Sequence, residues 1–350
     1  MNINTIVDEG VRRIASDIHL TVGIPPNLRI NGELIPLGDD PLTPDDTEEL
    51  VRQVLSDSQF DLLNERGELD FSYSAPGQGR FRVNAYIQRG SYGLALRIIP
   101  LEIPSMQKLG LPPVISDLTR LARGLVLVTG PTGSGKSTTL ATMIDQINRE
   151  KKKHILTLED PIEYLHKHNK SIVNQREIGT DSKSFSSALR GALRQDPDVI
   201  LVGEMRDLDT ISIAITAAET GHLVLSTLHT LGSAKTIDRI IDVFPPYQQQ
   251  QIRVQLASVL QAVISQQLLP KADGNGRVAA MEVMIATPAI RNLIREDKVH
   301  QIDTAIQTGS KYRMQTMDNS LTELYRRGQI SKDIALSQAI STEDIKKYIV

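Results

Sequence analysis

Residues 130–138 read Gly-Pro-Thr-Gly-Ser-Gly-Lys-Ser-Thr and follow the apolar run 125–128 closely. A glycine-rich loop lets successive backbone N–H groups close around a polyphosphate, and the N-terminus of the next helix adds partial positive charge. In this pattern Lys136 reaches the β- and γ-phosphates, and the Ser137 hydroxyl is a ligand for Mg²⁺. An ordinary glycine-rich turn is the alternative. The motif with both flanking elements favours a nucleoside triphosphate site, with these binding residues: Gly130, Pro131, Thr132, Gly133, Ser134, Gly135, Lys136, Ser137 and Thr138.

A second apolar run, 199–202, is followed directly by Gly203 and Glu204. In open α/β folds, ligands bind at the carboxyl ends of the parallel strands. We therefore expect Glu204 to hold Mg²⁺, directly or through a water molecule. A solvated glutamate on a turn is the alternative.

Phosphoryl transfer to water also needs a group that orients the attacking water. Three carboxylates, Glu159, Asp160 and Glu163, come just after the strand candidate 154–158. Composition alone equally allows a simple acidic loop. Beside a phosphate loop, we expect one of the three to orient the water, and the residue pattern does not choose among them.

Two histidines, His222 and His229, flank the apolar run 223–227. With one before the strand and one after it, they are poorly placed to share a metal ion. His229, at the carboxyl end, is positioned to reach the γ-phosphate or the attacking water. A structural role is the alternative for each histidine.

Arginines alternate with apolar residues near the end of the first hundred residues. The segments 80–87 and 92–99 have the alternation of a β-hairpin, which places Arg80 and Arg82 on one polar face with Arg97. That face could simply be solvated. The alternative is that the arginines close over the triphosphate from outside the loop, as arginine fingers do.

The elements that position these groups differ before and after residue 113. The earlier part predicts a small α+β domain with helices at 5–15 and 43–65 and hairpins at 28–37 and 80–99. Beyond residue 113 strands and helices alternate, as in a parallel sheet flanked by helices. The expected strands are 125–129, 154–158, 198–202 and 223–227, and the expected helices are 136–149, 184–195 and 208–219. From about residue 245 the pattern is mostly helical: 246–269, 287–296, 299–308, 317–327 and 331–340.

Four prolines and a glycine in 99–113 suit a hinge between the two parts. The expected division is an N-terminal domain over 1–99, a hinge linker over 100–113, an ATPase core over 114–270 and a helical C-terminal subdomain over 271–350.

Composition narrows the class of protein. The 350 residues are 40% hydrophobic and 23% charged, with no cysteine, which fits a globular protein of a reducing cytoplasm without thiolate metal sites. No apolar stretch is long enough to span a bilayer, so we expect any membrane role to be peripheral. Residues 1–100 carry a net charge of −6, and the remainder carries +3. An overall charge of −3, 4% aromatic residues and no tryptophan argue against a nucleic-acid motor.

These motifs, in this order, resemble the secretion ATPases of the pilus and type II secretion superfamily over essentially the whole chain. The matching segments are Ser16–Leu20, Gly130–Thr138 (Walker A), Leu158–Tyr164 (Asp box), Asp198–Asp207 (Walker B) and Thr220–Thr230 (His box). The segment Ala289–Glu296 resembles a signature of the branch that retracts type IV pili, although an amphipathic helix is the alternative. The lack of cysteines, and of room for an additional N-terminal domain, also favours retraction over extension or secretion.

The resemblance implies an α/β fold with a RecA-like P-loop NTPase core, a small PAS-like α+β N-terminal domain and a helical C-terminal region. It further implies a cytoplasmic homohexamer, peripheral at the inner membrane, that uses ATP and Mg²⁺. Its partners would be the inner-membrane pilus platform protein, with the extension ATPase or a second retraction ATPase as further candidates and no direct contact with nucleic acid. The implied catalytic residues are Glu163, Glu204, His229, His222, Arg82 and Arg97, with Ser137 and Glu204 at the metal.

Three other functions remain open at this point. The same catalytic residues would serve an extension or secretion ATPase. A nucleic-acid motor could use the same RecA-like core, and a nucleotide sensor that does not hydrolyse ATP would keep the phosphate loop.

Overall fold

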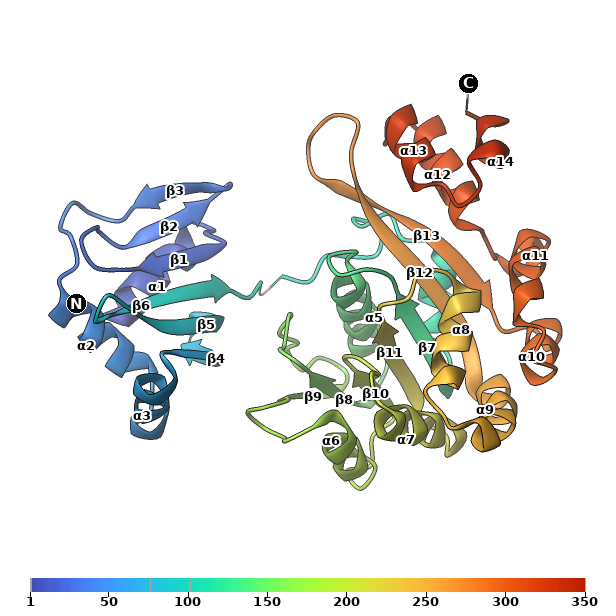
Figure 1. The fold of residues 1–350 in the computed structure, drawn as a ribbon, viewed down its shortest axis with the longest axis horizontal. Helices are drawn as coiled ribbons and strands as arrows, with labels where there is room; N and C mark the ends of the chain where they lie inside the picture. Colours follow the sequence, from blue (N-terminus) through green and yellow to red (C-terminus); the bar gives the residue numbers. More distant parts are fainter. Residues whose placement is uncertain (1, 76, 101, 350) are drawn as a thin grey trace. The chain divides into compact units, whose positions relative to one another are not determined.

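The computed structural model describes residues 2–75, 77–100 and 102–349. The chain divides into two compact units (Figure 1). The first consists of Met1–Glu102 together with the short segment Glu163–Leu165, and the second of Ile103–Ile162 and His166–Val350. Each unit has its own sheet and its own hydrophobic core.

The first unit contains a six-stranded sheet of order β3-β2-β1-β6-β5-β4, in which all neighbouring strands are antiparallel. Its elements are α1 (Ile3–Arg12), β1 (Asp17–Leu20), β2 (Asn27–Ile30), β3 (Glu33–Pro36), α2 (Pro44–Val54), α3 (Asp57–Arg66), β4 (Glu68–Ala75), β5 (Gly79–Gln88) and β6 (Ser91–Ile98). Both predicted hairpins are present. The helix expected over 43–65 is instead two helices, because the Ser56 side chain accepts from the Gln59 N–H and starts α3 as a capping box.

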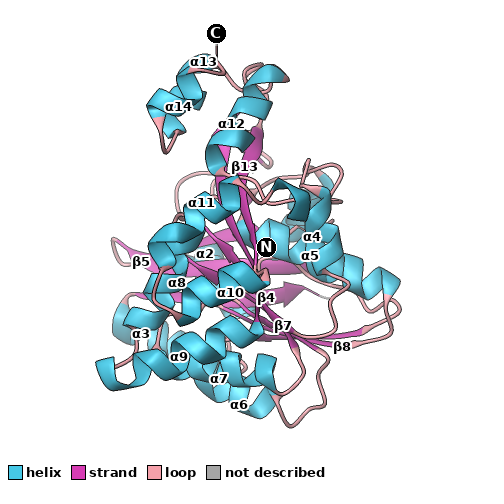
Figure 2. Cartoon of the chain, turned by 90° about the vertical axis from the view of Figure 1, so that its right-hand side faces the viewer, coloured by secondary structure: helices cyan, strands magenta, loops and turns pink. Residues whose placement is uncertain are grey.

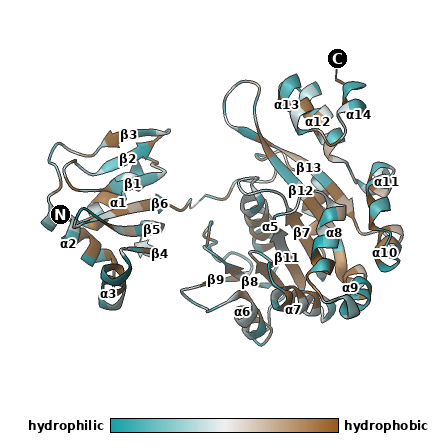
Figure 3. Cartoon of the chain, in the orientation of Figure 1, coloured by the Kyte–Doolittle hydropathy of each residue, from teal (hydrophilic) through white to brown (hydrophobic). Residues whose placement is uncertain are grey.

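The core of the first unit lies against one face of this sheet. Along β5, Phe81, Val83 and Ala85 are fully buried, whereas Arg82 between them is exposed. This alternation gives the sheet one apolar and one polar face, as the changing colours along its strands indicate (Figure 3).

The second unit contains a seven-stranded sheet of order β13-β12-β7-β11-β10-β8-β9, parallel except for β13. Its strands are β7 (Gly124–Thr129), β8 (His154–Glu159), β9 (Ile172–Glu177), β10 (Val199–Val202), β11 (Leu223–Leu228), β12 (Leu260–Pro270) and β13 (Arg277–Ile285). Its α-helices are α4 (Pro113–Leu118), α5 (Lys136–Glu150), α6 (Phe185–Ala192), α7 (Leu208–Glu219), α8 (Ser233–Asp242), α9 (Pro246–Val259), α10 (Pro288–Arg295), α11 (Ile302–Gln307), α12 (Met317–Arg326), α13 (Lys332–Gln338) and α14 (Thr342–Lys346). Two short 3₁₀ helices, Val299–Gln301 and Ser310–Tyr312, complete it.

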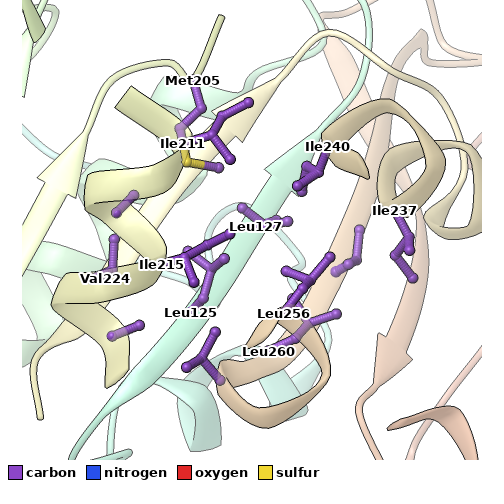
Figure 4. Packing of buried hydrophobic residues seen from close by; sticks show 14 of the residues in the cluster. Leu125, Leu127, Met205, Ile211, Ile215, Val224, Ile237, Ile240, Leu256 and Leu260 are labelled. Carbon is purple, nitrogen blue, oxygen red and sulfur yellow. The ribbon is translucent and has the colours of Figure 1, made fainter. Parts of the chain in front are cut away.

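Helices cover both faces of this sheet. Leu125 and Leu127 of β7 pack into a core with residues of α6 to α11, part of which Figure 4 displays. Val126 and Val128, which point to the other face, pack with α4 and α5. Of the last three helices, α12 packs on β13, and α13 and α14 pack against α12 in the same hydrophobic cluster (Figure 2). Because both faces are buried there, the central strands β7 and β10 are continuous apolar runs, which is the pattern that the sequence displayed.

The predicted fold class is confirmed, but one expected helix is wrong. The helix predicted over 246–269 ends at Val259, and Leu260–Pro270 is the strand β12. It lies between β7 and β13 and is buried on both faces, and an apolar run of this kind fits a buried strand as well as the helix that was expected. The strand β13 likewise lies in the region expected to be helical, whereas α10 to α14 confirm the rest of that expectation. The four-part division of the chain stays a prediction.

Candidate functional site

The phosphate loop connects β7, which ends at Thr129, to α5, which begins at Lys136. Its backbone needs glycine at both ends. Gly130 has φ +138°, and a Cβ there would lie 2.1 Å from the Gln266 carbonyl oxygen. Gly135, with φ +86°, starts α5 in the left-handed region. The predicted strand, loop and helix are therefore all present.

The ammonium group of Lys136 is held inside this loop. Its Nζ donates to the carbonyl oxygens of Gly130, at 2.8 Å, and Pro131, at 2.9 Å. Burial lowers the pKa of Lys136, while the negative charge of Glu204 opposes that shift. A polyphosphate in the loop would compete with the two carbonyls for this ammonium group, and as an anion it would be the stronger partner.

The carboxyl ends of three parallel strands bring further groups to the loop. The β11 residue Leu228 pairs with Thr129, so His229 emerges beside Gly130. Glu204 comes just after β10, on the other side of β11. His229 Nε2 lies 3.4 Å from Glu204 Oε2. The structure thus brings Lys136, Glu204 and His229 to one edge of the sheet, as the strand order requires.

Glu204 is also ion-paired to Arg206, with 2.7 Å between Oε1 and Nε. Its side chain is only 16% exposed, so the carboxylate is partly shielded from solvent. Ser137, by contrast, is exposed in the first turn of α5.

These residues fit a Mg²⁺ ion that is held mainly by substrate. Within the described ranges no three His, Cys, Asp or Glu residues are grouped as a protein-only metal site. Mg²⁺ in nucleotide sites takes phosphate oxygens and waters together with one or two protein groups. Ser137 and Glu204 would be those groups.

The three carboxylates at the end of β8 differ in exposure: Glu159, the last residue of the strand, is half-buried, whereas Asp160 and Glu163 are exposed. Glu159 accepts hydrogen bonds from Thr157 Oγ1 at 2.6 Å and from Gln175 Nε2 at 3.1 Å. Glu163 is exposed. The backbone N–H of the preceding Ile162 donates to the buried Glu177, at 3.1 Å. Glu163 is therefore solvent-accessible on an anchored loop, which suits a group that must meet water, and its catalytic role stays a prediction.

His222 does not join this site within its own chain. It precedes β11, and the Gly124 N–H, at the start of β7, donates to its carbonyl oxygen. Its ring Nδ1 lies 2.8 Å from the Ala217 carbonyl oxygen. Six strand residues, about 20 Å of extended chain, separate it from His229. His222 therefore lies at the opposite end of β11 from the phosphate loop, and the catalytic role that the resemblance implies for it stays a prediction.

In the first unit, Arg82 and Arg97 face each other across the β5–β6 pair. Arg97 Nε donates to Asp17 Oδ1 at 2.9 Å. Burial tends to raise the pKa of Asp17, but hydrogen bonds from Ser16 and Arg97 lower it below its ordinary value. Both guanidinium groups lie on the exposed face of the sheet, where a ligand could reach them.

Three buried polar residues were not predicted: two lie in β12, which was expected to be a helix, and one lies in β13. Gln266 Nε2 donates to the Ser134 carbonyl oxygen at 2.7 Å, and Gln266 Oε1 accepts from Thr139 Oγ1 at 2.8 Å. Ser265 Oγ accepts from the backbone N–H of Gly232. The available signal was the polar run Ser265-Gln266-Gln267 inside an apolar stretch.

The third missed residue is Glu282 of β13, which is 4% exposed. Its Oε1 accepts from the Ser233 backbone N–H at 2.7 Å and from Ser233 Oγ at 2.6 Å. The N-cap residue of α8, Gly232, has no side chain to cap the helix, so this carboxylate caps it from another element. Glu282 and Ser265 are register partners that together hold the loop after His229.

Comparison with known proteins places this fold and site in one family. Residues 2–335 match the family described as "Type II/IV secretion system protein". The chain belongs to this family, and the resemblance predicted from its motifs is confirmed. Among the described residues, no helix is both long and apolar enough to cross a membrane.

Individual relatives narrow the comparison. The chain is 51% identical to the type IV pilus retraction ATPase PilT of Pseudomonas aeruginosa, over 97% of this chain and 98% of the relative. It is 49% identical to a twitching motility protein of Neisseria gonorrhoeae, over 91% of this chain and 86% of the relative. A crystal structure of the pilus retraction motor PilT with bound ADP superposes with a TM-score of 0.91, at 52% identity, and covers 99% of both chains.

Proposed function

We propose that this chain is an ATP-hydrolysing motor that powers the retraction of type IV pili. The observation that carries the proposal is a complete phosphate loop, flanked by Glu204 and His229, in a chain that aligns with a pilus retraction ATPase over nearly its full length. The motor would disassemble pili, and twitching motility and DNA uptake would depend on this disassembly.

Each residue in the proposed reaction has one task. The loop N–H groups and Lys136 bind the β- and γ-phosphates of ATP. Glu163 orients the attacking water and accepts its proton, which a carboxylate can do at neutral pH. Ser137 and Glu204 would hold Mg²⁺, which would supply positive charge against the phosphates. His229, beside Gly130, stabilises the charge that develops on the γ-phosphate.

Arg82 and Arg97 supply the coupling in this proposal. When the first unit meets a bound nucleotide, the two guanidinium groups contact the γ-phosphate, and hydrolysis removes that contact. The proline-rich segment 99–113 is the hinge that permits the movement. The nucleotide that is bound would thereby determine the position of the first unit.

The working assembly we propose is a homohexameric ring. It lies in the cytoplasm against the inner membrane, where it drives the pilus platform protein, with the extension ATPase or a second retraction ATPase as candidate partners. Ring contacts are heterologous, so closure of one subunit is transmitted to the next.

Several residues of the segment Ala289–Glu296, which suggested retraction, pack or form hydrogen bonds within the chain itself. Ile290 and Ile294 are buried. Arg291 Nε donates to the Ala286 carbonyl oxygen, and its Nη1 donates to the carbonyl oxygen of Ser258 at the end of α9. The proposed direction of the motor therefore rests on the full-length similarity rather than on this helix.

Deletion of the gene from its own host distinguishes retraction from extension. A retraction motor predicts that the deletion strain still displays surface pili, seen by electron microscopy, but shows no twitching. The wild-type gene should restore movement, and a Lys136→Ala allele should not. A bare cell surface after deletion would contradict the proposal and indicate an extension motor.

A further inference from the structure

Gln266 occupies an unusual position for an amide side chain. It lies in β12, between β7 and β13, and is only 2% exposed. Both ends of its amide are nevertheless satisfied, one by Ser134 and the other by Thr139. A buried amide with geometrically defined partners holds them at a fixed separation, because either broken bond would leave a polar group unpaired.

The two partners of Gln266 lie on either side of the residues that meet phosphate. Ser134 is in the loop, and Thr139 is in the first turn of α5, so Lys136, Ser137 and Thr138 lie between them. The Gln266 backbone also packs against Gly130, the first residue of the loop. One residue of a neighbouring strand thus contacts the start of the loop, its end and the helix that follows.

We propose that Gln266 is a positioning residue that sets the shape of the phosphate loop before nucleotide arrives. This proposal rests on the nucleotide-binding function proposed above. A loop held in its binding shape does not lose conformational freedom on binding, and so it binds more tightly. Gln266 itself touches no nucleotide; it acts through Ser134 and Thr139.

The chain offers a matched control in the next residue. Gln267 is also in β12 and is 7% exposed, and it forms no side-chain hydrogen bond with any described residue. Because successive side chains of a strand point to opposite faces, it points away from α5. Replacement by methionine keeps the volume of either side chain and removes its hydrogen-bonding groups.

The experiment measures the ADP affinity of the purified full-length protein by calorimetry, beside its melting temperature. Gln266→Met should weaken ADP binding on the order of tenfold, the effect of losing two buried hydrogen bonds. Gln267→Met should leave the affinity within about twofold of wild type. Wild-type affinity in Gln266→Met, with only a lower melting temperature, would overturn the proposal. Failure of the wild-type protein to bind ADP would instead contradict the proposed function.

Two further variants test the same role of Gln266 if Gln266→Met folds poorly. A neutral Glu side chain has one donor and one acceptor, like the amide, whereas an ionised one cannot donate to the Ser134 carbonyl. Gln266→Glu should therefore bind ADP weakly at pH 8 and recover affinity, relative to wild type, as the pH falls. Thr139→Val combined with Gln266→Met should cost less than the sum of the two changes. A pH-independent ratio or strict additivity would overturn the positioning role.

Discussion

The two sheets of this protein present functional groups in different ways. The sheet of the first unit is antiparallel and buries one face, so polar residues such as Arg82 and Arg97 lie on its open face. The sheet of the second unit is covered by helices on both faces. Its accessible functional side chains, such as Glu204 and His229, therefore lie at the ends of the strands. Burial, more than residue type, decides where each unit can meet a ligand.

The two units also differ in how their functional side chains are held in place. On an open face, an arginine is oriented by a neighbour such as Asp17 and remains free to change partner. At a buried strand end, the loops are held by side chains from inside the sheet, such as Gln266 and Glu282. We therefore expect changes at these buried supports to cost stability as well as function, and changes on the open face to cost activity alone.

The largest effect is expected at the acidic loop of the second sheet. Glu163→Gln should lower kcat by about 10²- to 10⁴-fold, the usual range for removal of a general base, with ADP affinity unchanged. Glu159→Gln is the matched control, because Glu159 is already engaged by Thr157 and Gln175. Steady-state phosphate release compares the two. A greater loss for Glu159→Gln would move the catalytic role to that residue.

A smaller loss is expected from the open face of the first sheet. Arg82→Gln should lower kcat by about 10- to 100-fold, which corresponds to one lost charge-assisted hydrogen bond in the closed state. The melting temperature should stay at the wild-type value, because exposed charges contribute little to stability. Arg29→Gln, on β2 of the same sheet, serves as the control. A large fall in melting temperature would mean that Arg82 is structural and would break the contrast between the units.

Unlike Arg82, the buried Glu282 should contribute to the stability of the fold. Burial raises the pKa of Glu282, despite hydrogen bonds from Ser233 that lower it. The group therefore favours folding most below its unfolded pKa of 4.5, and this contribution is lost as the pH rises through the folded value. Glu282→Ala should cost about 1–3 kcal/mol of unfolding free energy. Glu282→Gln should cost little at pH 8, because an amide oxygen caps α8 without a buried charge. Equal losses in denaturant melts would contradict this account.

The smallest effect is expected at His222, which precedes β11 at the end of the strand away from the phosphate loop. His222→Gln should leave the ADP affinity of the protein within about twofold of wild type, because the ring contacts Ala217 and not the phosphate loop. His229→Gln, at the other end of the same strand, should lower turnover. Calorimetry and phosphate release on both variants check the pair. A tenfold loss of affinity in His222→Gln would show that strand-end position does not decide the role.

Much of the site could be predicted from local sequence. The loop from Gly130 to Thr138 is continuous in the chain, and its flanking strand and helix were found correctly. Glu204 and His229 were recognisable because each follows a short apolar run that was correctly predicted to be a buried strand. In such cases one continuous segment contains both the pattern that predicts the strand and the residue that is expected to function.

The parts that were missed depend on contacts between distant segments. Gln266 meets Thr139 across 127 residues, and Glu282 meets Ser233 across 49 residues. No local pattern encodes these pairs, and the apolar run of β12 fits a buried helix as well as a buried strand. The separation of His222 from His229, by contrast, could be predicted, because the apolar run 223–227 between them was recognised as a strand.

The central claim is that a nucleotide is hydrolysed at the edge of the second sheet. Its most direct test is phosphate release from ATP by the purified protein, beside Lys136→Ala and Glu163→Gln, with particle size recorded in the same samples. A hexamer should hydrolyse ATP, both variants should lose this activity, and Glu163→Gln should still bind ATP. A well-formed ring that binds ATP without hydrolysing it, or hydrolysis that survives Lys136→Ala, would contradict the account.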